Sequence, residues 1–271
     1  MADRKFETVI SLITKETDRI ASFLLESDHE LPTWSPGAHV KVHLPSGKVR
    51  QYSLVSSPTA RSYRIGVLHE VNGRGGSAEM HGLKEGGRLS ISEPVNQFPL
   101  VDGNVPVLAI AGGIGITPLI PMARALKAYE RDWRLFYCTR SREQTAFSEE
   151  VSSLGDDRVF PIHDEGVPEN GLNIEHLLSE TTRDTHIYVC GPGGLIKAVA
   201  SIAKSQGWPA SQIHWEAFTA SEPSQRQTMS DGFEIELRRS GLRAPVGPSE
   251  SILSVVRRLG VSVDSVCEQG C

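Results

Sequence analysis

Arg50-Gln51-Tyr52-Ser53-Leu54 is the stretch around which the rest of the sequence can be organised. It follows a run that reads as a strand, His39 to Leu44, and a turn at Pro45-Ser46-Gly47. Side chains alternate along a strand, so an arginine, an aromatic ring and a hydroxyl gather at one strand end. Arginine can pair bidentately with a phosphate, and the ring and hydroxyl suit a flavin. The alternative is an ordinary surface strand with a cross-strand tyrosine.

The chain has 271 residues, which predicts two domains and part of a third. A net charge of −5 argues against a nucleic-acid partner. No apolar run approaches the ~20 residues that span a bilayer, and the N-terminus lacks the apolar core of a signal peptide. Four cysteines, two of them at the extreme C-terminus, do not suggest a disulfide framework. We therefore expect a cytoplasmic protein that does not engage a membrane; we also expect a monomer.

Residues 5–100 read as short strands separated by Gly, Pro, Asp and Asn turns, which is typical of an antiparallel barrel or sandwich. Residues 77–83 read as a short helix. Before this helix lies Asn72-Gly73-Arg74-Gly75-Gly76-Ser77, whose glycine N–H groups could converge on an anion such as a phosphate. The alternative is a flexible glycine hairpin. A small barrel could bring this loop and Arg50 to one rim.

Residues 105–220 alternate between strands and helices, with helices predicted at 119–129 and 147–154 among others, which predicts a parallel sheet covered on both faces. Ligands bind such a sheet at the carboxyl ends of its strands. Two glycine loops follow strands there, Gly112-Gly113-Ile114-Gly115-Ile116-Thr117-Pro118 and Gly191-Pro192-Gly193-Gly194. A glycine turn that opens a helix is an anion site, although either loop could be a tight turn only.

The remaining residues begin with a polar stretch at 221–230 that reads as a linker. Residues 233–239 and 243–246 read as strands, and residues 251–259 as an amphipathic helix. Cys267 and Cys271 then stand close together at the end of the sequence.

Three of these features together resemble the ferredoxin-reductase superfamily: Arg50-x-Tyr52-Ser53-Leu54, the glycine loop at 112–118, and Cys190-Gly191-Pro192. Their order matches a flavin barrel followed by a pyridine-nucleotide domain. A narrower resemblance is to the phthalate dioxygenase reductase family, which includes reductases of vanillate and related O-demethylases. It is carried by Gly73-Arg74-Gly75-Gly76-Ser77, Asn96-Gln97-Phe98-Pro99-Leu100, His214-Trp215-Glu216-Ala217-Phe218 and the cysteine-containing tail.

The resemblance implies a multi-domain fold. An FMN-binding antiparallel β-barrel would span residues 1–103, and an NAD-binding α/β domain with a parallel sheet would span residues 104–222. Residues 223–271 would form a linker and a partial β-grasp domain of the plant-type [2Fe–2S] ferredoxin class.

By the same resemblance, FMN would be held by residues of the barrel: Arg50, Gln51, Tyr52, Ser53, Val67, Gly75, Gly76 and Ser77. The nucleotide would be held by Gly112, Gly113, Gly115, Thr117, Pro118, Thr139, Arg140, Ser141, Cys190, Gly191 and Pro192. Tyr52 and Ser53 would act at the flavin, with Ser53 stabilising its reduced nitrogen, while Thr117 and Cys190 would orient the nicotinamide. Phe218 would either shield the flavin or serve as a core aromatic at a strand end.

Arg142 and Cys190 bear on which nucleotide binds and on how the site works. A carboxylate near the second strand end would indicate NADH, whereas Arg142 in Ser141-Arg142 could accept the 2′-phosphate of NADPH. We expect NADH on family grounds, with NADPH as the alternative.

Cys190 ends an apolar strand, so we interpret it as a small packing residue beside the hydride path and not as a nucleophile.

A plant-type cluster uses C-x4-C-x2-C and a later cysteine, four thiolates in all. Cys267 matches the opening of that motif and is the candidate metal ligand. The second ligand would fall one position after Cys271, so the two cysteines of this tail cannot complete a cluster. We expect a truncated ferredoxin domain; natural loss of the cluster is the alternative.

These features predict an NAD(P)H-dependent flavin oxidoreductase. It would be the reductase component of a multicomponent oxygenase or O-demethylase, passing electrons from NADH through FMN to a [2Fe–2S] cluster and on to a Rieske-type oxygenase. One alternative is a reductase that acts directly on free flavin, a quinone or a haem protein. Another is a redox-sensing module without turnover, against which the intact motifs argue.

Overall fold

The structure is a computed structural model that describes residues 4–155, 157–218, 233–238, 240–247, 250 and 252–261. The chain divides into two compact units, Met1–Phe218 and Thr219–Cys271, which are described separately. Among the described residues, no helix combines the length and the apolar character needed to cross a membrane.

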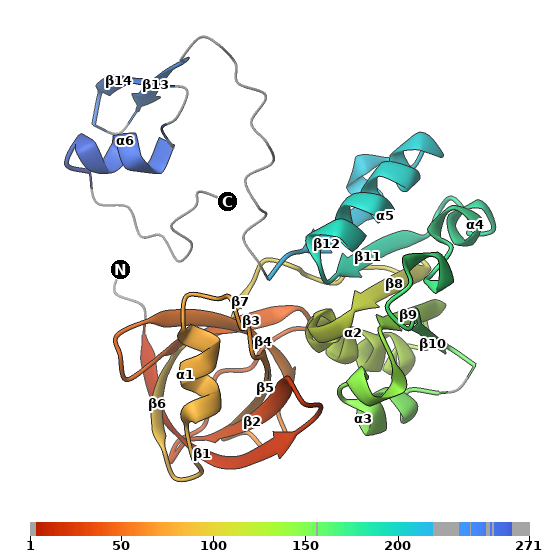
Figure 1. Cartoon of the computed structure of the whole chain (residues 1–271), viewed down its shortest axis with the longest axis horizontal. Helices are drawn as coiled ribbons and strands as arrows, with labels where there is room; N and C mark the ends of the chain where they lie inside the picture. Colours follow the sequence, from red (N-terminus) through yellow and green to blue (C-terminus); the bar gives the residue numbers. More distant parts are fainter. Residues whose placement is uncertain are drawn as a thin grey trace. The chain divides into compact units, whose positions relative to one another are not determined.

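The first part of the larger unit is a closed antiparallel barrel (Figure 1). Its strands are β1 (Lys5–Lys15), β2 (Ile20–Glu26), β3 (Ala38–His43), β4 (Val49–Ser56), β5 (Ser62–Leu68) and β6 (Arg88–Ser92). The strand order is β4-β5-β2-β1-β6-β3, and pairing of β3 with β4 closes the ring. Alternate residues such as Phe23, Leu25, Val40, Val42 and Ile65 point inward and form the barrel core. Helix α1 (Gly76–Gly82) and the short strand β7 (Val95–Asn96) complete this part, and the expected barrel is confirmed.

The second part is a five-stranded parallel sheet. Its strands are β8 (Val107–Gly112), β9 (Trp133–Thr139), β10 (Val159–His163), β11 (His186–Cys190) and β12 (Ile213–Glu216). They lie in the order β10-β9-β8-β11-β12, so the chain changes direction across the sheet after β10. The carboxyl ends of β8 and β11 meet at this switch point, where open α/β sheets bind ligands.

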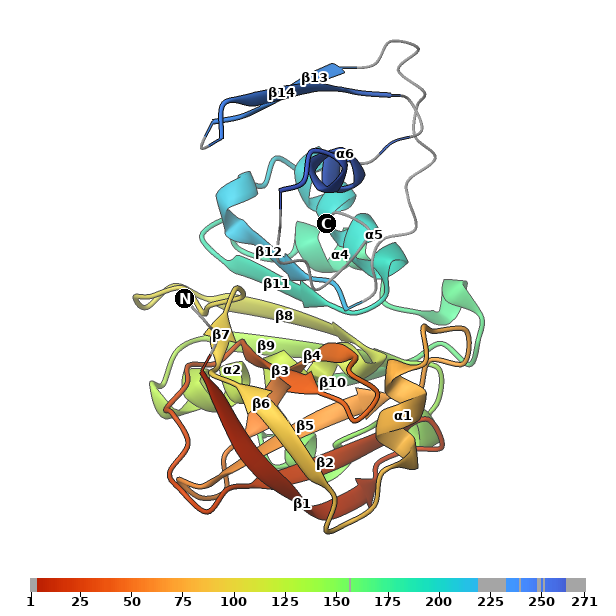
Figure 2. The ribbon, with the colours of Figure 1, turned by 90° about the vertical axis from the view of Figure 1, so that its left-hand side faces the viewer.

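Helices cover both faces of this sheet, as expected. Helices α2 (Ile116–Ala128) and α3 (Ser148–Ser152) pack on one face. Helices α4 (Ile174–Ser179) and α5 (Gly193–Ser205) pack on the other, the side away from the barrel in Figure 2. Short 3-10 turns lie at Gly113–Gly115, Arg142–Gln144, Pro168–Asn170 and Ala210–Gln212.

The barrel and the sheet share one hydrophobic core. Ile20 and Val55 of the barrel belong to the same buried cluster as Leu119 and Met122 of α2 and Tyr137 of β9. Helix α2 packs directly against β4, the strand that carries Arg50 to Leu54. The core therefore fixes β4, which carries the predicted flavin-binding residues, against α2, which follows the first glycine loop.

Two helices differ from the sequence-based expectation. The helix predicted at 147–154 spans only Ser148–Ser152; it cannot begin at Phe147, because this residue adopts a left-handed backbone with φ 57° and buries its ring. Helix α2 begins at Ile116, three residues earlier than predicted, because the 3-10 turn at Gly113–Gly115 runs straight into it.

The smaller unit contains β13 (Phe233–Leu237), β14 (Leu242–Val246) and α6 (Ile252–Arg258). The two strands form an antiparallel hairpin, and Ala244, Val246 and Val255 form a small core beneath the helix. A hairpin followed by a helix agrees with the expected partial β-grasp. The candidate ligand Cys267 lies outside the described residues.

Candidate functional site

Strand β4 presents its predicted residues at the rim of the barrel. Gln51 is exposed and its amide lies 3.2 Å from the His39 ring, whereas Ser53 is buried. The Tyr52 hydroxyl is buried without a hydrogen-bond partner among the described residues, and burial raises the pKa of Tyr52 to about 12. An unpartnered buried hydroxyl is costly unless a ligand completes it.

The glycine loop before α1 meets Arg50. A Cβ on Gly76 would lie 2.2 Å from Arg50 Nε, so any larger residue there would have to displace the Arg50 side chain. Gly75 has φ 81°, and the Ser77 hydroxyl accepts a hydrogen bond of 3.0 Å from the Glu70 N–H. Arg50 and the loop thus lie together at one rim. Bare glycine backbone, a guanidinium and the unpartnered Tyr52 hydroxyl fit the phosphate and ring of a flavin.

Val67 stands apart from this group. Its side chain is fully buried in the barrel core, and its carbonyl lies 3.0 Å from the His81 ring nitrogen. Any contact of Val67 with a flavin would therefore run through its backbone, and its binding role stays a prediction.

The two glycine loops of the sheet pack backbone against backbone. A Cβ on Gly115 would lie 2.1 Å from the Cys190 carbonyl oxygen. Gly191 has φ 156°, and a Cβ there would lie 2.9 Å from the backbone of Gly112. Thr117 is buried at the start of α2, beside the equally buried Pro118, and donates a hydrogen bond of 3.0 Å to the Ile114 carbonyl. The loops after β8 and β11 thus form one continuous floor.

The barrel touches this floor at Gly66. A Cβ on Gly66 would lie 2.8 Å from both Thr117 Cγ2 and the Phe147 ring. Gly66 was not predicted as a site residue, although a glycine inside a strand is a known signal of close approach. It lets β5 lie directly against the residue expected to orient the nicotinamide.

Glu216 is the second residue that the sequence analysis missed. It ends β12, beside Cys190 of β11, and it accepts a hydrogen bond of 3.5 Å from Ser53 Oγ. Burial raises the pKa of Glu216 to about 7, so its carboxyl is partly protonated near neutral pH. A proton donor or acceptor therefore lies within reach of the Ser53 hydroxyl.

Cys190 is fully buried, and burial together with the Glu216 charge raises the pKa of its thiol well above the usual range. A protonated thiol is a poor nucleophile, which agrees with the packing interpretation. Phe218 is 42% exposed and is therefore not a core aromatic. Its shielding role stays a prediction.

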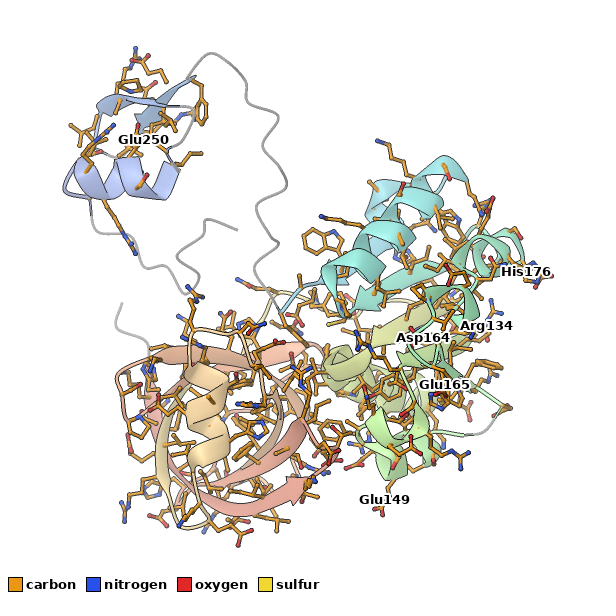
Figure 3. All side chains as sticks on the ribbon, viewed as in Figure 1. Arg134, Glu149, Asp164, Glu165, His176 and Glu250 are labelled. Carbon is orange, nitrogen blue, oxygen red and sulfur yellow. The ribbon has the colours of Figure 1, made fainter. Side chains whose placement is uncertain are left out.

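A cleft of about 920 Å³ runs along the carboxyl ends of the strands. Gly112, Gly113 and Pro192 line one part of it, and Thr139, Arg140 and Ser141 line another. Ser141 Oγ donates a hydrogen bond of 2.7 Å to the Glu143 carboxylate, which also lines the cleft. Asp164, labelled with its neighbour Glu165 in Figure 3, adds a carboxylate just after β10. Glycine backbone and a cleft of this volume with carboxylates in its wall suit a dinucleotide.

No group of three or more His, Cys, Asp or Glu side chains in the described part of the chain could hold a metal ion. Cys138 and Cys190 both lie in strands of the parallel sheet. A four-thiolate cluster therefore has no site among these residues.

Comparisons with known proteins agree with this geometry. Residues 109–201 match the family of oxidoreductase NAD-binding domains. A vanillate O-demethylase oxidoreductase of Pseudomonas putida is 41% identical over 97% of this chain and 84% of its own length. The beta subunit of a heme-dependent oxidative N-demethylase of Ectopseudomonas mendocina is 38% identical over 89% of this chain and 75% of its own.

A solved structure of phthalate dioxygenase reductase is similar throughout. That reductase has a modular structure for electron transfer from pyridine nucleotides to [2Fe–2S]. It superposes with a TM-score of 0.76 at 34% identity, over 96% of this chain and 82% of its own.

Proposed function

Because the chain belongs to the phthalate dioxygenase reductase family of oxidoreductases, we propose that it carries electrons from NADH through FMN to a [2Fe–2S] centre that serves an oxygenase. The observation that carries this proposal is the meeting of barrel and sheet at one point. Ser53 of the barrel contacts Glu216 of the sheet, and Gly66 of the barrel approaches Thr117. A flavin at the barrel rim and a nucleotide in the cleft would face each other there.

In this proposal the barrel holds FMN through residues at one rim. Arg50 and the loop Gly75, Gly76 and Ser77 bind its phosphate, while Tyr52 and Ser53 bind its ring system. Bound FMN would supply the chemistry of accepting the two electrons of a hydride and releasing them singly. Ser53 and Glu216 hold a proton at the ring, and the raised pKa of Glu216 suits it to proton exchange near neutral pH.

The α/β part binds the nucleotide with the glycine floor, and Thr117, Cys190, Gly191 and Pro192 orient the nicotinamide. Thr139, Arg140 and Ser141 lie at the adenosine end. Glu143 and Asp164 favour NADH over NADPH, because a carboxylate in that region accepts a hydrogen bond from the ribose hydroxyl and repels a 2′-phosphate. Arg142, the alternative pointer to NADPH, is not among the described residues that line the cleft.

Residues beyond those described, with Cys267 as one ligand, would hold the [2Fe–2S] centre, and a Rieske-type oxygenase would be the partner. A haem protein is the second candidate partner, because one relative is the subunit of a heme-dependent N-demethylase. The monomeric state and the cytoplasmic location stay predictions.

An anaerobic titration with NADH tests the proposed function. We expect the purified protein to contain FMN, identified after release by chromatography, and its flavin absorption to bleach with about one equivalent of NADH. NADPH should bleach it far more slowly. Protein that binds no flavin, or holds a flavin that NADH does not bleach, would contradict the proposal.

A further inference from the structure

The cleft proposed for the nucleotide is not built by the α/β part alone. Thr17, Asp18 and Arg19 line it as well, although they belong to the turn between β1 and β2 of the barrel. Ile20 and Leu68 add apolar barrel contacts beside them. The barrel therefore forms one wall of the cleft.

This turn is held in a defined conformation. The N–H groups of Glu16 and Thr17 both donate to the Ile20 carbonyl, at 2.9 and 3.0 Å. The Thr17 hydroxyl accepts hydrogen bonds from the N–H groups of Arg19 and Ile20. These hydrogen bonds close the turn on itself and fix its backbone.

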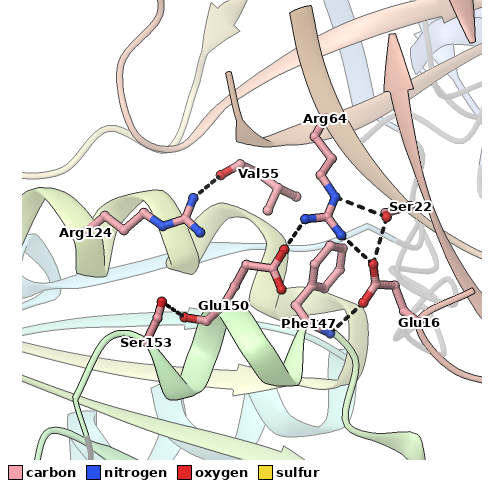
Figure 4. Close-up of polar contacts among 8 residues, drawn as sticks. All are labelled: Glu16, Ser22, Val55, Arg64, Arg124, Phe147, Glu150 and Ser153. Atoms are coloured by element: carbon pink, nitrogen blue, oxygen red, sulfur yellow. Dashed lines mark hydrogen bonds and ion pairs between the residues drawn. The ribbon is translucent and has the colours of Figure 1, made fainter. Parts of the chain in front are cut away.

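The turn is also anchored to the α/β part through Glu16, as Figure 4 shows. The Glu16 carboxylate pairs with Arg64 at 2.7 Å and accepts a hydrogen bond of 3.1 Å from the Phe147 N–H. Arg64 also pairs with Glu150 of α3. The barrel wall of the cleft is therefore fixed relative to the sheet.

The two charged side chains of this wall, Asp18 and Arg19, differ in how strongly they are paired with opposite charges. Asp18 forms an ion pair of 2.7 Å with Lys15 on the same turn. Arg19 donates a hydrogen bond of 2.9 Å from Nη2 to the His69 carbonyl, and it forms a long ion pair of 3.9 Å with Glu70. The Arg19 side chain remains 55% exposed. It thus presents a positive charge that is oriented by a backbone carbonyl and only weakly neutralised.

Only two cationic side chains occur among the described residues that line the cleft, Arg19 on the barrel wall and Arg140 on the sheet wall. The pyrophosphate is the anionic part of NADH, since its ribose, adenine and nicotinamide groups carry no charge at neutral pH. A guanidinium pairs with phosphate oxygens through two parallel N–H donors. We propose that Arg19 of the barrel binds the pyrophosphate of the nucleotide, so that both parts of the larger unit hold one ligand.

This inference rests on the proposed function, and the experiment separates the two. Arg19→Gln removes the charge, and Arg19→Lys keeps it without the planar donor pair. Arg61→Gln is the matched control, because Arg61 is an exposed barrel arginine just before β5, whereas Arg19 lies near the other end of that strand. The probes are ADP-ribose, which carries the pyrophosphate without nicotinamide, and 1-benzyl-1,4-dihydronicotinamide, which carries no phosphate.

We expect Arg19→Gln to raise the Kd of ADP-ribose and the KM for NADH about tenfold, with Arg19→Lys in between and Arg61→Gln unchanged. Flavin content and reduction by the phosphate-free dihydronicotinamide should stay as in the unmodified protein. Unchanged ADP-ribose binding in Arg19→Gln, or an equal loss with the phosphate-free probe, would overturn the inference. If neither reductant bleaches the flavin of the unmodified protein, the proposed function fails instead.

Discussion

The Glu216 carboxyl is half-buried, and this raises its pKa from the ordinary 4.5 to about 7. A carboxyl whose pKa is raised by folding stabilises the fold at low pH, and that contribution is lost as the pH rises from about 4.5 through 7. Glu216→Gln removes this titration. We expect the variant to gain about 3 kcal/mol in free energy of unfolding, relative to the unmodified protein, between pH 4.5 and pH 8.

Urea melts at several pH values measure this gain. Glu165→Gln is the control, because Glu165 is exposed. The free energy of unfolding of this variant, plotted against pH, should run parallel to that of the unmodified protein. Parallel curves for Glu216→Gln as well would mean that Glu216 titrates normally and does not hold a proton at Ser53 near neutral pH.

Single residues also show where sequence reasoning succeeds and where it stops. Arg50 and Gly76 could be expected together, because an arginine and a glycine loop both suit a phosphate and a small barrel has one rim. Glu216 and Gly66 could not, because their importance arises from contacts between segments far apart in the chain. Glu216 meets Ser53 across 163 positions, and no local pattern encodes that distance.

At the scale of elements, the loops after β8 and β11 form one floor only because their glycines lack side chains. In Gly115→Ala the new methyl would lie 2.1 Å from the Cys190 carbonyl oxygen, and the atoms that it meets there belong to the backbone of Cys190 and Gly191. One loop must therefore move. We expect a loss of about 2–3 kcal/mol in free energy of unfolding, together with a higher KM for NADH. Thermal melts and steady-state kinetics measure the two effects.

Gly194→Ala provides the matched control within α5. A Cβ at Gly194 would meet no atom of the described residues within 4 Å, and alanine favours the helix, so we expect a gain of up to about 1 kcal/mol. Equal effects of the two substitutions would show that the close approach of the loops does not constrain the fold.

The strands and helices could be predicted from the alternation and spacing of apolar residues, because each strand and helix buries one face or both. Their first and last residues could be predicted less well. Helix α3 is shorter than its sequence suggests, because Phe147 gives up helical geometry to bury its ring against Gly66. Tertiary packing, which the local sequence does not contain, decided that boundary.

At the scale of the whole molecule, the larger unit depends on how the barrel is fixed to the α/β part. Apolar packing of α2 on β4 supplies one connection, and the ion pairs of Arg64 supply another. Arg64 also donates a hydrogen bond of 3.1 Å to the Ser22 hydroxyl, which in turn donates to Glu16 (Figure 4). This network is largely buried, and so its loss should affect both parts together.

Arg64→Met tests this connection, because it keeps most of the apolar length of the side chain but leaves the Glu16 and Glu150 carboxylates without their cation. Removing one partner of a buried ion pair costs about 3–5 kcal/mol, so we expect a loss of that order in urea melts. Arg158→Met, which removes the exposed pairs of Arg158 with Asp132 and Asp157, should cost less than about 1 kcal/mol. Because Glu16 anchors the turn that carries Arg19, ADP-ribose should also bind more weakly to Arg64→Met under conditions where that variant is folded. Normal stability and normal ADP-ribose binding in Arg64→Met would show that apolar packing alone joins the two parts and that the turn needs no ionic anchor.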